Sequence, residues 1–223
     1  MAYCTNPYVI AAIVGNFYQE STVNPGIWEG LDEYASTGGY GLGQWTDNPP
    51  VVMRRMALWN WMTEHGYPID SGEGQLEFLI AEDIWIPNLI QPSSYATLTE
   101  YLNSTSTNLS ALVYEFMYHW EGINDNSYNN RYSWASAMLP IFQSSLAERK
   151  PWTTGNFYCD NTQATFNSLL VYDFFMGTTP EPPTPPEPPT PPEPYEPTEE
   201  EVITLVKNIL RKRNKKGGIY IEL

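Results

Sequence analysis

The sequence predicts an α+β fold that is predominantly helical, with a small β-hairpin element, followed by a Pro-rich linker and a short amphipathic helix. Apolar residues recur at helical spacing through most of residues 1–146. A glycine-rich, aromatic stretch from Ile27 to Thr46 breaks this pattern and indicates strands joined by tight turns. Six-residue proline-rich units begin at Pro180 and exclude a helix or a central strand there.

The first predicted helix has Asn6 as its N-cap and Pro7 as its first residue. Apolar residues then recur at i, i+3, i+4 and i+7 from Ile10 to Phe17, and we expect the helix to end at Glu20. The hairpin follows, and helical periodicity resumes after it. The further helices expected from this periodicity cover residues 51–65, 73–86, 95–103, 109–121, 131–147 and 161–175.

Composition divides the chain into four segments. Residues 1–146 carry 3 basic and 15 acidic residues, and residues 147–177 read as a helical extension that packs on them. Residues 178–197 form a linker rich in proline and glutamate, which favours extended polyproline II. Residues 198–223 contain six of the 11 basic residues of the chain and form a separate docking segment.

The composition also excludes several classes of protein. A net charge of -15 does not fit a nucleic-acid-binding protein, because such proteins neutralise phosphates with basic side chains. Two cysteines are too few for a disulfide scaffold and lack the paired spacing of a zinc site. Neither a signal peptide nor a membrane-spanning helix is expected, because apolar runs are short and no positive region precedes the first one. We expect no metal and no cofactor.

Two motifs carry the functional information. The segment N-F-Y-Q-E-S-T-V-N-P from Asn16 to Pro25 is followed by G-Y-G-L-G-Q-W-T from Gly39 to Thr46. This ordered pair resembles the bacteriophage tail lysozyme domain, within the goose-type lysozyme and lytic transglycosylase group. The resemblance covers about the first 146 residues and continues in Arg54, Arg55, Gln75 to Leu79, Ala111 to Glu121, Asn130 and Arg131.

The resemblance implies a lysozyme-like catalytic domain with Glu20 as the general acid. It places Gln44, Tyr40 and Trp45 along a saccharide cleft, and Trp28 is a further candidate for stacking on a sugar. Cleaving a β-1,4 glycosidic bond requires protonation of the bridging oxygen, so one carboxyl must remain protonated near neutral pH. The end of a helix dipole and nearby aromatic side chains would both raise the pKa of a carboxyl at this position.

The second carboxylate of the reaction is harder to assign. A hydrolase would use Asp32 or Glu33 as the base that activates water, with Glu29 and Asp47 as further candidates. The related lytic transglycosylases need no such base, because a hydroxyl of the substrate attacks instead. Gln44 also has a structural alternative, as an amide that bonds the hairpin backbone.

The cysteines open a rival interpretation. Cys4 stands just before a predicted helix, where a thiol can be activated, and His65 or His119 would be its base. The alternative is a structural role for both cysteines, in which Cys4 and Cys159 form a disulfide or remain as two buried thiols. For Arg131, a structural ion pair is favoured over binding of a peptide-stem carboxylate.

The docking segment begins with a capping-box spacing, Thr198 and Glu201, before an amphipathic helix. Such a short helix cannot stand alone in water. A phage structural protein or self-association through residues 198–223 is the favoured partner, and a membrane surface is the less favoured one.

The resemblance therefore implies a phage muramidase that cleaves the bond between N-acetylmuramic acid and N-acetylglucosamine in bacterial peptidoglycan. The docking segment favours a virion-associated tail enzyme, made in the host cytoplasm and used on the host wall during entry. The alternatives are a lytic transglycosylase, a soluble endolysin, or a non-catalytic wall-binding tail component.

Overall fold

The computed structural model describes residues 2–33, 35–49, 52–89, 91–123, 125–144 and 147–178, which belong to one unit of the chain. The expected linker beyond Thr178 and the expected amphipathic helix of residues 198–223 lie outside the described residues. Within them, seven α-helices and one small antiparallel sheet confirm the predominantly helical α+β class. None of the described helices has the length and apolar character needed to span a membrane.

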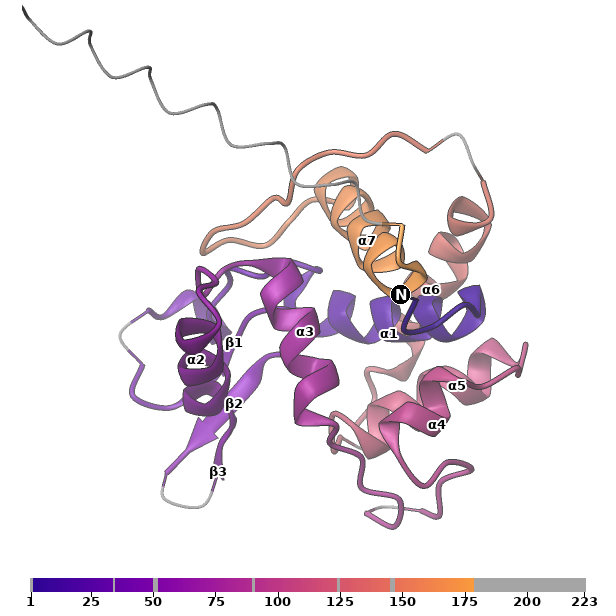
Figure 1. Ribbon diagram of the computed structural model, residues 1–223, viewed down its shortest axis with the longest axis horizontal. Coiled ribbons are helices and arrows are strands. Elements are labelled where there is room, and N and C mark those ends of the chain that lie inside the picture. Colours follow the sequence, from indigo (N-terminus) through magenta and orange to yellow (C-terminus); the bar gives the residue numbers. More distant parts are fainter. Residues whose placement is uncertain are drawn as a thin grey trace, which may run out of the picture. The chain divides into compact units, whose positions relative to one another are not determined.

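Helix α1 (Pro7–Ser21) occupies the centre of this unit (Figure 1). Asn6 is the N-cap, as predicted from the sequence, and its side chain accepts a hydrogen bond of 3.0 Å from the N–H of Tyr8. Ten of its residues, between Val9 and Ser21, are buried, because other helices contact it from more than one side. The helix ends where Thr22 adopts a left-handed conformation, one residue beyond Ser21.

Helices α5 (Leu109–His119), α6 (Tyr128–Phe142) and α7 (Asn161–Met176) contact α1. Helices α1 and α6 approach closely at Gly15, where an added Cβ would lie 2.3 Å from the carbonyl oxygen of Arg131. Helix α6 begins three residues earlier than the expected 131, because Tyr128 stacks on Tyr114 of α5 at 3.9 Å between ring centroids. This packing decides the boundary that periodicity misplaced.

The sheet contains β1 (Gly38–Tyr40), β2 (Trp45–Asn48) and β3 (Val52–Met53), in that order and antiparallel. The pair β1 and β2 is the predicted hairpin. The third strand is a correction, because a helix was expected from residue 51. Met53 pairs with Asp47 in the sheet, and α2 (Arg54–Glu64) begins only after it.

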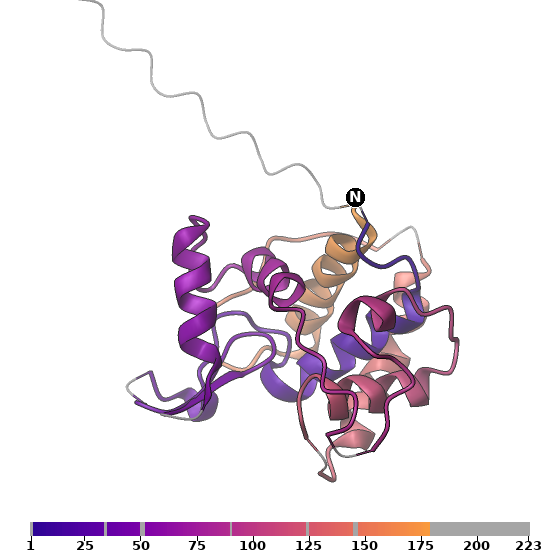
Figure 2. The same cartoon turned by 60° about the horizontal axis from the view of Figure 1, so that its bottom comes forward.

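Helix α3 (Gly72–Glu82) is capped by Ser71 and ends at Asp83 in a left-handed conformation, so the expected helix of residues 73–86 is shorter than predicted. The short helix α4 (Leu98–Leu102) begins three residues later than the expected 95. Its N-cap is Thr97, whose side chain accepts a hydrogen bond from the N–H of Glu100. Viewed from two sides, α2, α3 and the sheet lie towards the C-terminal end of α1, and α4 and α5 lie along its other side (Figures 1 and 2).

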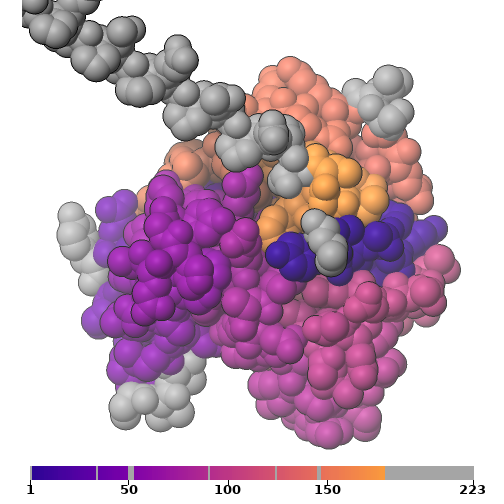
Figure 3. All heavy atoms as spheres, in the orientation of Figure 1, coloured from indigo at the N-terminus to yellow at the C-terminus, as the bar shows by residue number. Residues whose placement is uncertain are grey.

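Helix α7 lies against the N-terminal segment of the chain (Figure 3). It begins with a reciprocal capping box between Asp160 and Gln163 and ends at Gly177, whose φ of 67° suits glycine. The carbonyl of Phe175 accepts hydrogen bonds from the N–H groups of Tyr3 and Cys4, at 2.8 and 3.0 Å. Residues far apart in sequence therefore close the unit at this point.

Candidate active site

Glu20 lies in the last turn of α1, and its side chain is 15% exposed. Burial is the largest effect on its carboxyl and raises its pKa. The charge and hydrogen bond of Arg131 lower this pKa, whereas the nearby charges of Asp125 and Glu29 raise it, and the net direction is upward. A partly exposed glutamate with a raised pKa is suited to deliver a proton to a bound substrate.

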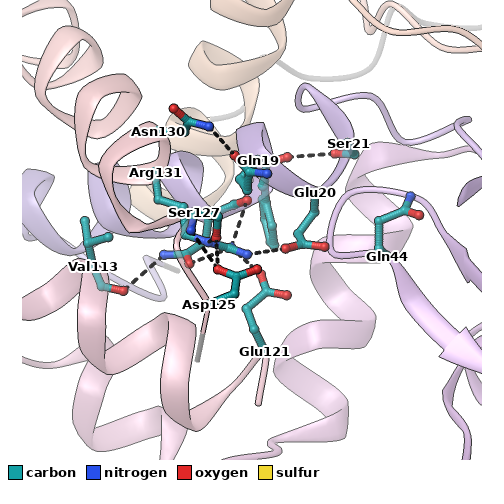
Figure 4. A network of polar contacts seen from close by, with 12 residues as sticks. Gln19, Glu20, Ser21, Gln44, Val113, Glu121, Asp125, Ser127, Asn130 and Arg131 are labelled. Atoms are coloured by element: carbon teal, nitrogen blue, oxygen red, sulfur yellow. Dashed lines mark hydrogen bonds and ion pairs between the residues drawn. The ribbon is translucent and has the colours of Figure 1, made fainter. Parts of the chain in front are cut away.

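Arg131 reaches Glu20 from α6 and is the centre of a polar network (Figure 4). Its side chain is 1% exposed, and one of its nitrogens donates a hydrogen bond to Glu20 Oε1. Its other nitrogens donate to Asn16 Oδ1 and Ser127 Oγ, both at 2.9 Å. The structure therefore uses Arg131 in an ion pair, as favoured from the sequence, but the partner is the candidate catalytic residue.

Glu121 is a second carboxylate beside Arg131. It stands two residues beyond the end of α5, its side chain is 4% exposed, and its Oε1 lies 3.8 Å from a guanidinium nitrogen of Arg131. This oxygen has no hydrogen-bond partner among the described residues. Burial raises the pKa of Glu121 well above its usual range, and the charge of Glu20 raises it further, against smaller lowering effects of Arg131 and Arg54.

The residues around Glu20 in the first motif fasten α1 to the hairpin. The Ser21 hydroxyl donates to the carbonyl of Leu42 at 2.8 Å. Gln75 of α3 bridges the same region, because its Oε1 accepts from the N–H of Leu42 and its Nε2 donates to the carbonyl of Pro25. At Gly41, where φ is 77°, an added Cβ would lie 2.4 Å from Gln75. These contacts hold the end of α1 that carries Glu20 against the turn of the hairpin.

Gln44 lies in this turn and has a left-handed backbone with a φ of 46°. Its amide nitrogen donates to the carbonyls of Gly41 and Ile27 at 3.1 and 3.3 Å, which is the structural role weighed from the sequence. Figure 4 places its side chain across from Glu20. Contact between Gln44 and a sugar stays a prediction.

Two of the aromatic residues expected along the cleft are buried. Trp45 is 0% exposed and packs edge-on against Trp120, and Tyr40 is 2% exposed. Both rings pack in the core in this structure, and contact of either ring with a sugar stays a prediction. The reason is the hairpin, which turns both side chains toward the core. Trp28 is half-buried and packs edge-on against Tyr40, and its stacking on a sugar stays a prediction.

The candidates for the second carboxylate differ in position. Asp32 and Glu33 are exposed and follow the short 3-10 helix η1 (Glu29–Leu31). Their role as the base stays a prediction. Glu29 accepts a hydrogen bond of 2.7 Å from the N–H of Gly39. Asp47 is buried and accepts hydrogen bonds from the N–H groups that begin α2, so it has a structural role.

The cysteines show no sign of activation. Cys4 and Cys159 are both free and buried, so the structure contains two thiols and not a disulfide. Burial raises the pKa of each thiol to about 11, which disfavours the reactive thiolate. His119 is buried and bonds the carbonyl of Ile86, and His65 stacks on Trp61. Among the described residues, no group of three or more His, Cys, Asp or Glu side chains is arranged to hold a metal ion.

Sequence analysis did not assign a role to Glu121, Asp125 or Asn16. Asn16 carried a usable signal, because it stands one helical turn before Glu20 and therefore on the same face of α1. Glu121 had no such signal, since nothing in the sequence says that the segment after α5 lies beside the end of α1. Tertiary packing alone brings these acids to one arginine.

Comparison with known proteins identifies the family of this chain. Residues 5–142 match the family described as phage tail lysozyme. The chain belongs to the phage tail lysozyme family. It is also 34% identical over 110 residues to morphogenesis protein 1 of Bacillus phage B103, a match that covers 47% of this chain and 27% of that protein. The chain thus matches about a quarter of the length of this relative.

Proposed function

We propose that this phage lysozyme-family protein is a peptidoglycan-cleaving glycosidase with Glu20 as its general acid. The observation that carries the proposal is the placement of Glu20. It lies at the end of a buried helix, keeps 15% of its side chain exposed, and has a pKa raised by burial. Family membership supports peptidoglycan as the substrate. A non-catalytic wall-binding protein would have no need for a partly exposed carboxyl in this environment.

We further propose that the reaction is hydrolysis of the β-1,4 bond between N-acetylmuramic acid and N-acetylglucosamine. Asp32 and Glu33 support this choice, since both are exposed and within reach of solvent water. The alternative is a lytic transglycosylase, which needs no second carboxylate. In that reaction Glu20 alone would act as acid and base. In either case Glu20 protonates the bridging oxygen as the bond breaks.

We also propose that the protein acts as part of a virion. The family and the phage morphogenesis relative support this location, and a soluble endolysin is the alternative. The catalytic unit would include the extension of residues 147–177, because α7 contacts α1. Residues 178–197 would act as a spacer, and residues 198–223 would bind a phage structural protein or a second copy of the chain.

The test uses purified peptidoglycan and mass spectrometry of the released fragments. We expect the wild-type protein to release fragments with reducing N-acetylmuramic acid ends, and Glu20→Gln to lose activity by about 10² to 10⁴-fold. Gln keeps the shape of the side chain, but its amide cannot act as a general acid. Glu64→Gln, an exposed position at the end of α2, is the matched control and should keep full activity.

Each outcome of this test has a separate meaning. Full activity of Glu20→Gln would end the assignment of a glycosidase site at this residue. Fragments with anhydro ends would change the assignment to a lytic transglycosylase, and Asp32 and Glu33 would then be ordinary loop residues. Loss of activity in Glu64→Gln would show that the assay reports general damage to the protein.

A further inference from the structure

The charges around Arg131 do not balance. Arg131 contributes one positive charge to a buried region that contains the carboxyls of Glu20 and Glu121. Asp125 adds a third acid, and bonds from Ser127 lower its pKa, so it is ionised at neutral pH. Asp125 is exposed, so water screens its charge, but ionisation of both glutamates would still place two negative charges beside one positive charge in a buried region. Such a state is costly, so the group must retain protons.

Among the described residues, the other basic side chain that acts on this group is already paired. Arg54 of α2 acts on Glu121, but its guanidinium already makes two hydrogen bonds to Glu82, at 3.0 and 2.9 Å. Glu29 of η1 also faces Glu20 and adds negative charge. Two further residues set the geometry, because Asn16 and Ser127 hold the guanidinium of Arg131 in place. Arg131 can therefore compensate one of its two glutamates at a time.

We propose that Glu121 is a positioning residue for Glu20: it competes for the single charge of Arg131 and takes that charge when Glu20 carries the proton. This inference rests on the proposed role of Glu20 as a general acid. It resolves a conflict in the site, because an acid held in a tight ion pair with arginine would give up its proton too early. A second carboxylate on the same arginine removes that difficulty.

The proposal involves two arrangements with the same number of protons and the same net charge. In the first, Glu20 is ionised and paired with Arg131, while the buried Glu121 carries the proton. In the second, Glu20 carries the proton and Arg131 compensates ionised Glu121 across the 3.8 Å that separates their atoms. Only the second can protonate a glycosidic oxygen. Substrate favours it, because protonated Glu20 donates a hydrogen bond to that oxygen.

The test is the pH dependence of kcat/KM for the wild-type protein and for Glu121→Gln, with peptidoglycan as the substrate. Gln cannot take over the charge of Arg131, so Arg131 acts on Glu20 alone. We expect the alkaline limb of the variant to move to lower pH by at least about one unit. On the acidic side of both alkaline limbs, where the rate no longer depends on pH, activity should stay within about threefold of the wild type, a ratio that corresponds to well under one pKa unit. Glu64→Gln is again the surface control.

Two outcomes would overturn the proposal. An alkaline limb that does not move would mean that Glu121 has no influence on Glu20, and an equal loss of activity at every pH would mean a purely structural role. Neither outcome affects the proposed function, which depends on Glu20→Gln. Inactivity of Glu20→Gln together with an unmoved limb in Glu121→Gln would leave the glycosidase and remove only this inference.

A second measurement needs no change at position 121. Carbon NMR of wild-type protein labelled at glutamate carboxyls follows the titration directly, and the Glu20 signal is the one absent in Glu20→Gln. We expect the Glu20 signal to change in two steps, because a coupled pair loses its protons in two macroscopic steps. A single step in the ordinary range of glutamate would contradict the shared arginine, even if Glu121→Gln failed to fold.

Discussion

Two buried arginines of this protein have opposite surroundings. Arg55, at the start of α2, has one acidic partner, Asp47, with its Nε 3.3 Å from the carboxylate, and both side chains are nearly inaccessible. Arg131 has two glutamates, and one oxygen of Glu121 has no hydrogen-bond partner in the described chain. The balanced pair stabilises the fold, because loss of either charge would leave the other charge buried without a partner. The unbalanced cluster can exchange protons, and the candidate catalytic residue lies there.

Removing the acid from the balanced pair should have the largest effect on stability. Asp47→Ala would leave Arg55 buried without its partner, and arginine cannot lose its proton to escape the cost. It would also remove the acceptor for the N–H groups of Arg55 and Met56. We expect a loss of about 3–5 kcal/mol in the free energy of unfolding at both pH 5 and pH 8, measured by urea denaturation.

Asp47→Asn is the control for this change, because it keeps an oxygen acceptor for the two N–H groups and removes only the charge. We expect it to lose less stability than Asp47→Ala. Equal stability of Asp47→Ala and the wild type would remove the structural half of the comparison, since Arg55 would then not depend on its partner.

Removing the base from the unbalanced cluster should cost less at low pH. Arg131→Met leaves two carboxyls that can neutralise themselves by binding protons, which Arg55 cannot do. Because the folded-state pKa values of Glu20 and Glu121 are already raised, stability falls as pH rises above the unfolded value, and loss of Arg131 extends that fall. We expect a loss of about 1–3 kcal/mol at pH 5 and a larger one at pH 8.

Denaturation of Arg131→Met and the wild type at the two pH values checks this sign. A loss that is equal at pH 5 and pH 8 would show that the glutamates do not take up protons when the arginine is absent. The two arginines would then behave alike, and the distinction between a balanced pair and a proton-holding cluster would fail.

The sequence predicted the parts of this site that depend on local pattern. The end of α1 at the motif around Glu20 follows from its N-cap, its apolar stripe and the polar residues after it, and these features act within one helix. The hairpin follows from its glycines, since Gly41 needs a positive φ. Both predictions concern contacts that the motif itself contains.

The partners of Glu20 could not be predicted in the same way. Arg131 lies 111 residues along the chain from Glu20, and periodicity does not say which face of α6 meets α1. The burial of Trp45 and Tyr40 was missed for a related reason: in a hairpin of a few residues, alternation alone does not tell which face the helices cover. Long-range packing decides these features.

Cys4→Ala should have the smallest effect on activity and stability, and it tests whether burial alone distinguishes the two regions. The Cys4 thiol is also buried and its pKa is also raised, to about 11, yet burial is the main cause and no acid and base compete there. If a raised pKa alone marked function, Cys4 would qualify as well as Glu20. We expect Cys4→Ala to cleave peptidoglycan within about twofold of the wild type and to lose about 1 kcal/mol of stability, as small buried truncations do. Loss of activity in Cys4→Ala, with Glu20→Gln still active, would transfer the chemistry to the thiol. An unchanged activity would instead support the view that an unbalanced set of charges, and not burial alone, distinguishes the candidate catalytic carboxyl.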